Sequence, residues 1–164
     1  MRLGRGISGG VERLRDRLVR VRHFRGHGVH SPFVYGLVRE VFMQRRLLPG
    51  PRALYEALLA AGFPQRRAIE MQNLAIHCGY DTFSLDSAGG ALCIVTPRAT
   101  GRAEALVREA AAGGATAVLF TADVTRAWRE QCRRIVAAHP STSIDRGRSL
   151  LLFHNHLPKQ HFRI

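Results

Sequence analysis

Histidine is the commonest metal ligand in proteins, and histidines cluster near both ends of this sequence. The clusters are His23, His27 and His30 in one part, and His154, His156 and His161 in the other. Zinc sites usually combine histidine with cysteine or carboxylate ligands at short spacing, and neither cluster has such a partner nearby. We therefore expect no metal site, and we interpret these histidines as anchors of the loops in which they lie.

The cysteines give no indication of nucleophilic or redox chemistry. Cys78, Cys93 and Cys132 are odd in number, far apart and set in apolar surroundings. This pattern predicts buried, reduced thiols rather than a disulfide framework or a zinc site. The sequence contains no nucleophile elbow, phosphate-binding loop, zinc-protease motif or kinase motif.

Two acidic residues follow apolar segments in the way that ligand-binding acids follow strands. Glu70 lies within a short strand predicted over residues 68–71, and Asp123 follows an apolar run over residues 117–120. A carboxylate at a strand end can bind a cofactor when its environment shifts its properties. The alternatives are a solvated or capping role for Glu70, and a role for Asp123 in capping the helix that begins at Thr125.

Charge is the most extreme property of the chain, with a formal net charge of +13. Arg13, Arg17 and Arg20 share one face of an amphipathic helix predicted over residues 11–21, and the apolar residues lie on another face. Such a face can bind nucleic acid by releasing counterions from phosphates. The alternative is an ordinary solvated helix face.

The elements divide the chain into a basic helical extension, residues 1–50, and an α/β part, residues 51–164, which we expect to form one compact unit. Ser31 and Pro32 form a cap and first position for a second helix, and a third helix precedes Gly62. Residues 73–88 show no assignable pattern. Buried strands are predicted over residues 91–95 and 117–120, joined by a helix that begins at a Thr100 cap. A further helix is predicted over residues 125–138. Antiparallel strands are predicted over residues 142–144, 150–153 and 161–164.

The sequence shows no segment typical of a membrane or secreted protein. No apolar run reaches the roughly 20 residues that a spanning helix needs, and the first residues lack the apolar region of a signal peptide. We expect a cytoplasmic protein without a membrane partner.

Motifs at both ends resemble a family of bacterial class I S-adenosylmethionine (SAM) methyltransferases. The N-terminal motif is His-Gly-Val-His-Ser-Pro-Phe-Val, residues 27–34, and the C-terminal segment ends in Lys-Gln-His-Phe, residues 159–162. The resemblance implies a three-layer α/β/α Rossmann-like fold, here truncated and preceded by a helical extension, with closing strands at the C-terminus. It also implies SAM as the cofactor if the protein is active.

The middle of the chain departs from the pattern of that family. The resemblance places Glu70 at the end of the first strand, and Gln72 and Ala75 where glycines of the SAM-binding turn are expected. Residues 91–123 match either the second and third strands of the family or its fourth and fifth. In the first alignment the ribose-binding acid is replaced around Thr96, and in the second Asp123 falls near an acidic motif.

Three hypotheses follow. The first is a degenerate methyltransferase homologue that survives as a domain or a partner subunit. The second is an active methyltransferase with an atypical SAM turn. The third is a basic module that binds RNA or DNA through Arg13, Arg17 and Arg20 without a cofactor.

Overall fold

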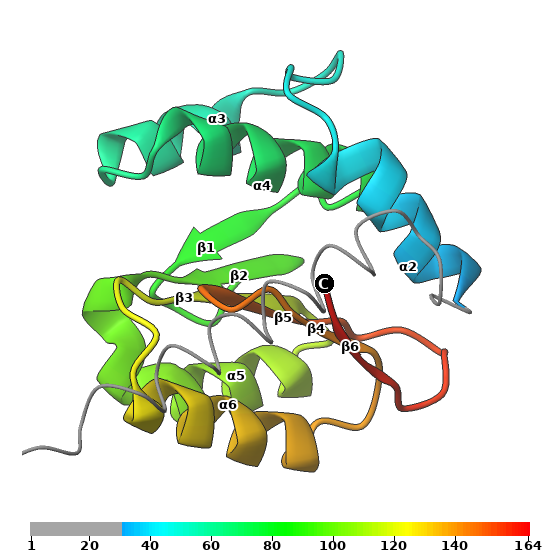
Figure 1. Ribbon diagram of the computed structural model, residues 1–164. Helices are drawn as coiled ribbons and strands as arrows, with labels where there is room; N and C mark the ends of the chain where they lie inside the picture. Colours follow the sequence, from blue (N-terminus) through cyan, green and yellow to red (C-terminus); the bar gives the residue numbers. More distant parts are fainter. Residues whose placement is uncertain (1–30) are drawn as a thin grey trace, which may run out of the picture.

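The computed structural model describes residues 31–164, which form a mixed α/β fold. Its strands are β1 Phe83–Leu85, β2 Leu92–Val95, β3 Thr116–Phe120, β4 Ser143–Asp145, β5 Ser149–Leu152 and β6 His161–Arg163. Its helices are α2 Pro32–Leu37, α3 Ala53–Ala60, α4 Gln65–Cys78, α5 Ala103–Ala112 and α6 Arg126–Ala138, with a π-helical turn η1 Val38–Phe42 and a 3-10 segment η2 Pro97–Arg102. The sheet lies between α2, α3 and α4 on one face and α5 and α6 on the other (Figure 1).

The six strands lie in the order β1-β2-β3-β5-β4-β6. The neighbours β1, β2 and β3 are parallel, and β5 is antiparallel to both β3 and β4. β6 pairs with β4 in parallel, so the prediction of an entirely antiparallel tail is wrong for this strand. The chain leaves β5, passes beyond β4 and returns along its outer edge, which makes β6 run with β4.

The predicted unit of two buried parallel strands joined by a helix is confirmed. Every residue of β2 and β3 is buried, as expected for parallel strands covered on both faces. The helical connection begins earlier than predicted, because Thr96 caps η2 by accepting a hydrogen bond from the Arg98 N–H at 3.3 Å. Thr100 lies inside η2 and is not the cap.

The helix predicted at Ser31 is confirmed as α2. The Ser31 hydroxyl accepts a hydrogen bond from the Val34 N–H at 3.4 Å, and Pro32 occupies the first turn. Val34 and Leu37 belong to the same hydrophobic core as Ile144 of the sheet. The helix predicted over residues 11–21, with Arg13, Arg17 and Arg20, and the histidines His23, His27 and His30 lie outside the described residues.

The strand predicted over residues 68–71 is wrong, because these residues lie inside the helix α4. Ala68, Met71, Leu74 and Ala75 recur at helical spacing and all are buried. The helix ends at Gly79, whose φ of 70° is the left-handed conformation typical of a glycine after a helix.

The prediction of buried thiols is confirmed for Cys93 and Cys132 but not for Cys78. Cys78, Cys93 and Cys132 are free, with Cys93 and Cys132 buried and Cys78 half-buried. Burial raises the pKa of Cys132 to about 12 and that of Cys78 to about 11. The thiolate forms needed for nucleophilic attack are therefore disfavoured at neutral pH.

None of the helices described for residues 31–164 combines the length and the apolar character that crossing a membrane requires.

Candidate functional site

The carboxyl ends of β1, β2 and β3 share one edge of the sheet because these strands are parallel. Ligands of open α/β sheets bind in crevices outside this edge. A hollow of about 350 Å³ lies there, between the ends of β1 and β2 and the segment that joins α3 to α4. Its lining residues are Ala61, Gly62, Phe63, Pro64, Leu85, Asp86, Thr96, Pro97 and Arg98.

Asp86, the first residue after β1, is the acid of this hollow. Its φ of 55° is the only positive φ of a non-glycine residue in the described part of the chain, and aspartate is among the few side chains that tolerate this conformation. Its two carboxylate oxygens accept hydrogen bonds from the Thr96 N–H at 2.6 Å and from the Thr96 hydroxyl at 2.7 Å. Both oxygens thus hold β1 to β2 at their carboxyl ends.

The turn after Asp86 requires a glycine. At Gly90, where φ is 73°, a Cβ would approach the backbone nitrogen of Phe83 to 2.8 Å. A strand, an acid and a glycine turn therefore occur in the order that the family resemblance expects, at residues 83–90 rather than 68–75. The turn leads directly back into β2 with no helix between the two parallel strands, whereas such connections usually contain one.

The predicted cofactor residue Glu70 does not line the hollow and has a structural role. Its side chain is buried and pairs with the Arg67 guanidinium at 2.8 Å and with the Arg146 guanidinium. Arg146 also lies over the Phe42 ring, 4.1 Å from its centroid. Burial lowers the pKa of Arg146, while the charge of Glu70 opposes that shift. Glu70 thus joins α4 to the turn between β4 and β5.

The predicted turn residues Gln72 and Ala75 also lie on α4 and form no turn. The Gln72 carboxamide oxygen accepts a hydrogen bond from the Tyr55 N–H at 3.0 Å, which fixes the start of α3. The neighbouring Asn73 binds the Leu48 N–H and the Arg46 carbonyl, both at 2.9 Å. Ala75 packs in the core. None of these side chains lines the hollow.

Asp123 lies beyond the carboxyl end of β3, exposed and outside the hollow. The prediction that it caps the next helix is wrong. Thr125 is the cap of α6, since its hydroxyl accepts a hydrogen bond from the Trp128 N–H at 3.1 Å. The Asp123 backbone instead closes a small turn, with its carbonyl accepting hydrogen bonds from the Thr121 hydroxyl at 2.7 Å and from the Thr125 N–H at 3.1 Å.

The structure thus brings none of Glu70, Gln72, Ala75 and Asp123 into one site. It places Asp86 at the edge instead, in the segment 73–88 for which the sequence showed no assignable pattern. The available signal was Leu85-Asp86 followed by Gly89 and Gly90. Among residues 31–164, no histidine or cysteine lines the hollow.

Within residues 31–164, no three histidine, cysteine, aspartate or glutamate side chains lie close enough together to hold a metal ion. His161, from the C-terminal histidine cluster, contacts the Ser143 hydroxyl through Nδ1 at 2.9 Å and so joins β6 to β4.

Comparisons with models of known protein families, with curated proteins and with solved structures found no match.

Proposed function

We propose that the chain is a shortened, non-catalytic homologue of class I SAM methyltransferases that acts as a protein partner. The observation that carries this proposal is that the carboxylates of Glu70 and Asp86 bind other residues of the fold. The buried carboxylate of Glu70 pairs with the partly buried Arg67 and Arg146, and both carboxylate oxygens of Asp86 accept hydrogen bonds from Thr96. A ribose hydroxyl would have to share either carboxylate with partners that already stabilise the fold.

The order of the strands supports the same proposal. In a doubly wound sheet the ligand crevice opens where the strand order reverses, with strands on both sides of it. Within residues 31–164, β1 is the edge strand of the sheet, and none of the described strands lies beyond it to form a second wall. A Rossmann-like fold truncated on that side would lose its crevice in this way.

The arrangement of β2 and β3 favours one of the two alignments left open by the sequence. β3 pairs directly with the closing strand β5, and β4 lies beyond β5. This position corresponds to the fourth and fifth strands of the resembled family rather than the second and third. The elements lost from the family pattern would then lie between β1 and β2, where a six-residue turn now replaces them.

Calorimetric titration with SAM at low salt tests this proposal. We expect no saturable heat from protein whose folding has been verified by its thermal transition. The opposite result would be one-to-one binding in the micromolar range that is lost in Asp86→Asn but kept in Asp123→Asn, an exposed acid on the same edge. That result would favour the alternative of an active methyltransferase with an atypical turn.

Nucleic-acid binding is the second candidate function, favoured by the net charge of +13. The described part of the chain adds a basic helix to this observation. α6 carries Arg126, Arg129, Arg133 and Arg134 against the single acid Glu130. A surface of this kind attracts phosphates without reading sequence.

A further inference from the structure

The described sheet ends at β1, and this strand directs part of its backbone away from the sheet (Figure 1). The Thr82 carbonyl accepts a hydrogen bond from the Leu92 N–H of β2 at 3.1 Å, and the Asp86 N–H donates to a carbonyl of β2 at 2.8 Å. Successive residues of a strand direct their backbone groups to opposite sides. The backbone groups of Phe83 and Leu85 therefore face outward, on what we call the outer side of β1.

Nothing in the described part of the chain pairs with the outer side of β1. Within residues 31–164, β2 is the only strand beside β1, and no other backbone group bonds to Phe83 or Leu85. The Ser87 hydroxyl lies 3.5 Å from the Leu85 carbonyl. Residues 81–82 before the strand and residues 87–90 after it are exposed. An open strand of this kind is a template for pairing with an extended segment of another chain.

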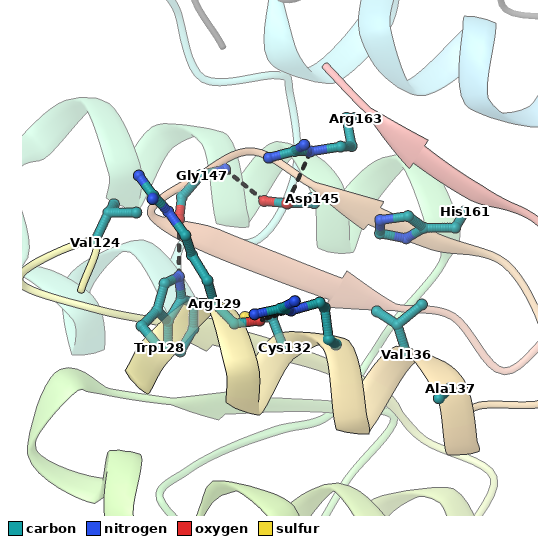
Figure 2. A pocket seen from close by; sticks show the side chains of 11 residues that line it. Val124, Trp128, Arg129, Cys132, Val136, Ala137, Asp145, Gly147, His161 and Arg163 are labelled. Atoms are coloured by element: carbon teal, nitrogen blue, oxygen red, sulfur yellow. Dashed lines mark hydrogen bonds and ion pairs between the residues drawn. The ribbon is translucent and has the colours of Figure 1, made fainter. Parts of the chain in front are cut away.

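The opposite end of the strand order, β6, is less suited to such pairing. β6 carries His161 and Arg163, and charged side chains on an edge strand disfavour the addition of a further strand. Figure 2 shows Arg163 directed from β6 toward Asp145 of β4, with its Nε 3.3 Å from the carboxylate. β1, with the sequence Phe-Ser-Leu, has no charged side chain.

The hollow at the carboxyl end of β1 adjoins its outer side, because Leu85 belongs to both. Phe63 and Pro64 give the hollow an apolar wall, and the Phe63 ring packs edge-on against Phe120 with the centroids 5.1 Å apart. A volume of about 350 Å³ is large enough for one aromatic side chain. In strand addition, backbone hydrogen bonds give affinity and such pockets select side chains. Since β1 has only three residues, the hollow must supply part of the affinity.

Charge indicates which kind of chain fits this surface. The net charge of +13 makes the approach of a second copy unfavourable and attracts an acidic segment. Arg98 lines the hollow and is exposed, so a carboxylate beside the aromatic residue can pair with it.

We propose that the outer side of β1 and the adjoining hollow bind an extended, acidic segment of a protein partner. The segment pairs with the backbone of Phe83 and Leu85 and places an aromatic side chain in the hollow. This proposal rests on the function proposed above, in which the chain acts as a protein partner, and it names the surface and the chemistry of that partner.

The probe is the peptide acetyl-Glu-Val-Thr-Val-Phe-Val-Glu-amide, titrated by NMR into the isotope-labelled full chain at constant ionic strength. We expect saturable binding that slows hydrogen exchange of the Leu85 amide about ten-fold or more. The Ser84 amide, which faces β2, should change less. Absence of saturable binding, or binding that leaves the exchange of Leu85 unchanged, would overturn the proposal.

Two altered peptides separate the backbone contribution from that of the hollow. N-methylation of the backbone amides removes the donors that strand pairing requires, and replacement of the Phe by Ala removes the side chain expected in the hollow. Each change should weaken binding about ten-fold or more. An N-methylated peptide that binds as well as the parent would contradict strand pairing.

Two exposed arginines give a matched pair of protein variants. Arg98 lines the hollow, whereas Arg108 lies on α5 and does not line it. We expect Arg98→Gln to weaken peptide binding about ten-fold, as the loss of one charge-assisted pair implies, and Arg108→Gln to leave it unchanged. Equal weakening in both variants would show general attraction to a basic chain and would contradict the site.

Calorimetry with SAM on the same protein distinguishes the two proposals. SAM binding would contradict the proposed function, whereas a protein that binds neither SAM nor the peptide would contradict the peptide site alone. Sedimentation of the protein without peptide tests the remaining occupant. A dimer in which the Leu85 amide is already protected would identify a second copy on the outer side of β1 and would overturn the proposal of an acidic partner.

Discussion

The buried carboxylate of Glu70 has a measurable structural consequence. Its side chain lies between the Arg67 and Arg146 guanidiniums and is only 3% exposed. Glu70→Ala would leave Arg146 charged and buried without its counter-ion. Breaking a buried pair in this way typically costs about 3–5 kcal/mol, and we expect a decrease of that order in the free energy of unfolding, measured by urea denaturation.

Glu130 provides the comparison for Glu70. It pairs with Arg126 at 2.8 Å on the exposed surface of α6, where ion pairs contribute little because water screens them. We expect Glu130→Ala to leave the urea midpoint nearly unchanged. Equal effects of the two variants would contradict the structural role of Glu70.

His139 makes stability depend on pH. Burial lowers its pKa from the ordinary value of 6.5, and hydrogen bonds to the Phe153 and Thr142 backbone only partly oppose this shift. Below pH 6.5, His139 therefore becomes protonated in the unfolded chain while it stays neutral in the folded chain. Above this pH, His139 is neutral in both states and does not reduce the free energy of unfolding. As the pH decreases toward the lowered pKa of His139, the free energy of unfolding falls.

Melting temperatures measured between pH 7.5 and pH 5 test this. The melting temperature should fall toward pH 5, and His139→Gln should reduce that fall. Part of the fall should persist in the variant, because burial also lowers the pKa of His161. His156→Gln, a replacement of an exposed histidine, is the control and should leave the fall in melting temperature unchanged. A fall that is the same in His139→Gln as in the unchanged protein would assign the pH dependence to other groups.

At the scale of elements, the sequence predicted the helices and strands that have a regular pattern. The continuous apolar runs of β2 and β3 were sufficient to predict these strands. The apolar face of α6 was sufficient to predict that helix. Each pattern has one clear period and is bounded by a recognisable cap or turn. Residues 68–71 of α4 were predicted as a strand and the following residues were left unassigned, because polar Glu70, Gln72 and Asn73 lie among the buried residues of this helix. Their burial depends on partners in other elements, such as Arg146 and Tyr55, which local pattern cannot reveal.

The strand that the sequence did not predict is β1. β1 has three residues, all half-buried, and no alternation that marks it. Its pairing depends on the Asp86 contacts with Thr96, which lies ten residues further along the chain. β6 was predicted as a strand from its alternation, but alternation does not say which neighbour a strand pairs with. Site residues that lie at strand ends, such as Asp86, were missed for the same reason as the strands.

The pairing of β6 gives a prediction for the C-terminus. Ile164 is buried in the core, and its N–H donates to the Asp145 carbonyl at 3.1 Å. Deleting residues 159–164 removes this strand and leaves β4 as the edge of the sheet. Burial of one such side chain contributes about 1.5–3 kcal/mol, so we expect a lower melting temperature by calorimetry.

Leu157→Ala is the control for the deletion, because this side chain is 39% exposed just before the strand. It should melt like the unchanged protein. A truncated chain that melts at the unchanged temperature would show that β6 contributes nothing to the fold.

At the scale of the whole molecule, the two ends of the sheet differ in what they offer a ligand. Beside β1, Asp86 holds Thr96, and none of the strands in the described part of the chain lies beyond β1. Near β6, the helix α6 carries the exposed Arg126, Arg133 and Arg134. Positive charge is therefore a property of the surface as well as of the composition, and it bears on the hypothesis of nucleic-acid binding.

The last prediction concerns where such binding would occur. If the predicted face of Arg13, Arg17 and Arg20 binds phosphates, affinity for duplex RNA or DNA falls steeply with salt, because each neutralised phosphate releases counterions. Replacing these three residues with Gln should reduce the slope of log affinity against log salt by up to about 0.9 for each duplex phosphate that is no longer neutralised. Fluorescence anisotropy over a series of salt concentrations measures this slope. Arg126, Arg129 and Arg133 on α6 form the matched triple and are also replaced with Gln. If this second set of replacements reduces the slope and the first set does not, the prediction for the N-terminal face is wrong. Phosphate binding would then be assigned to α6.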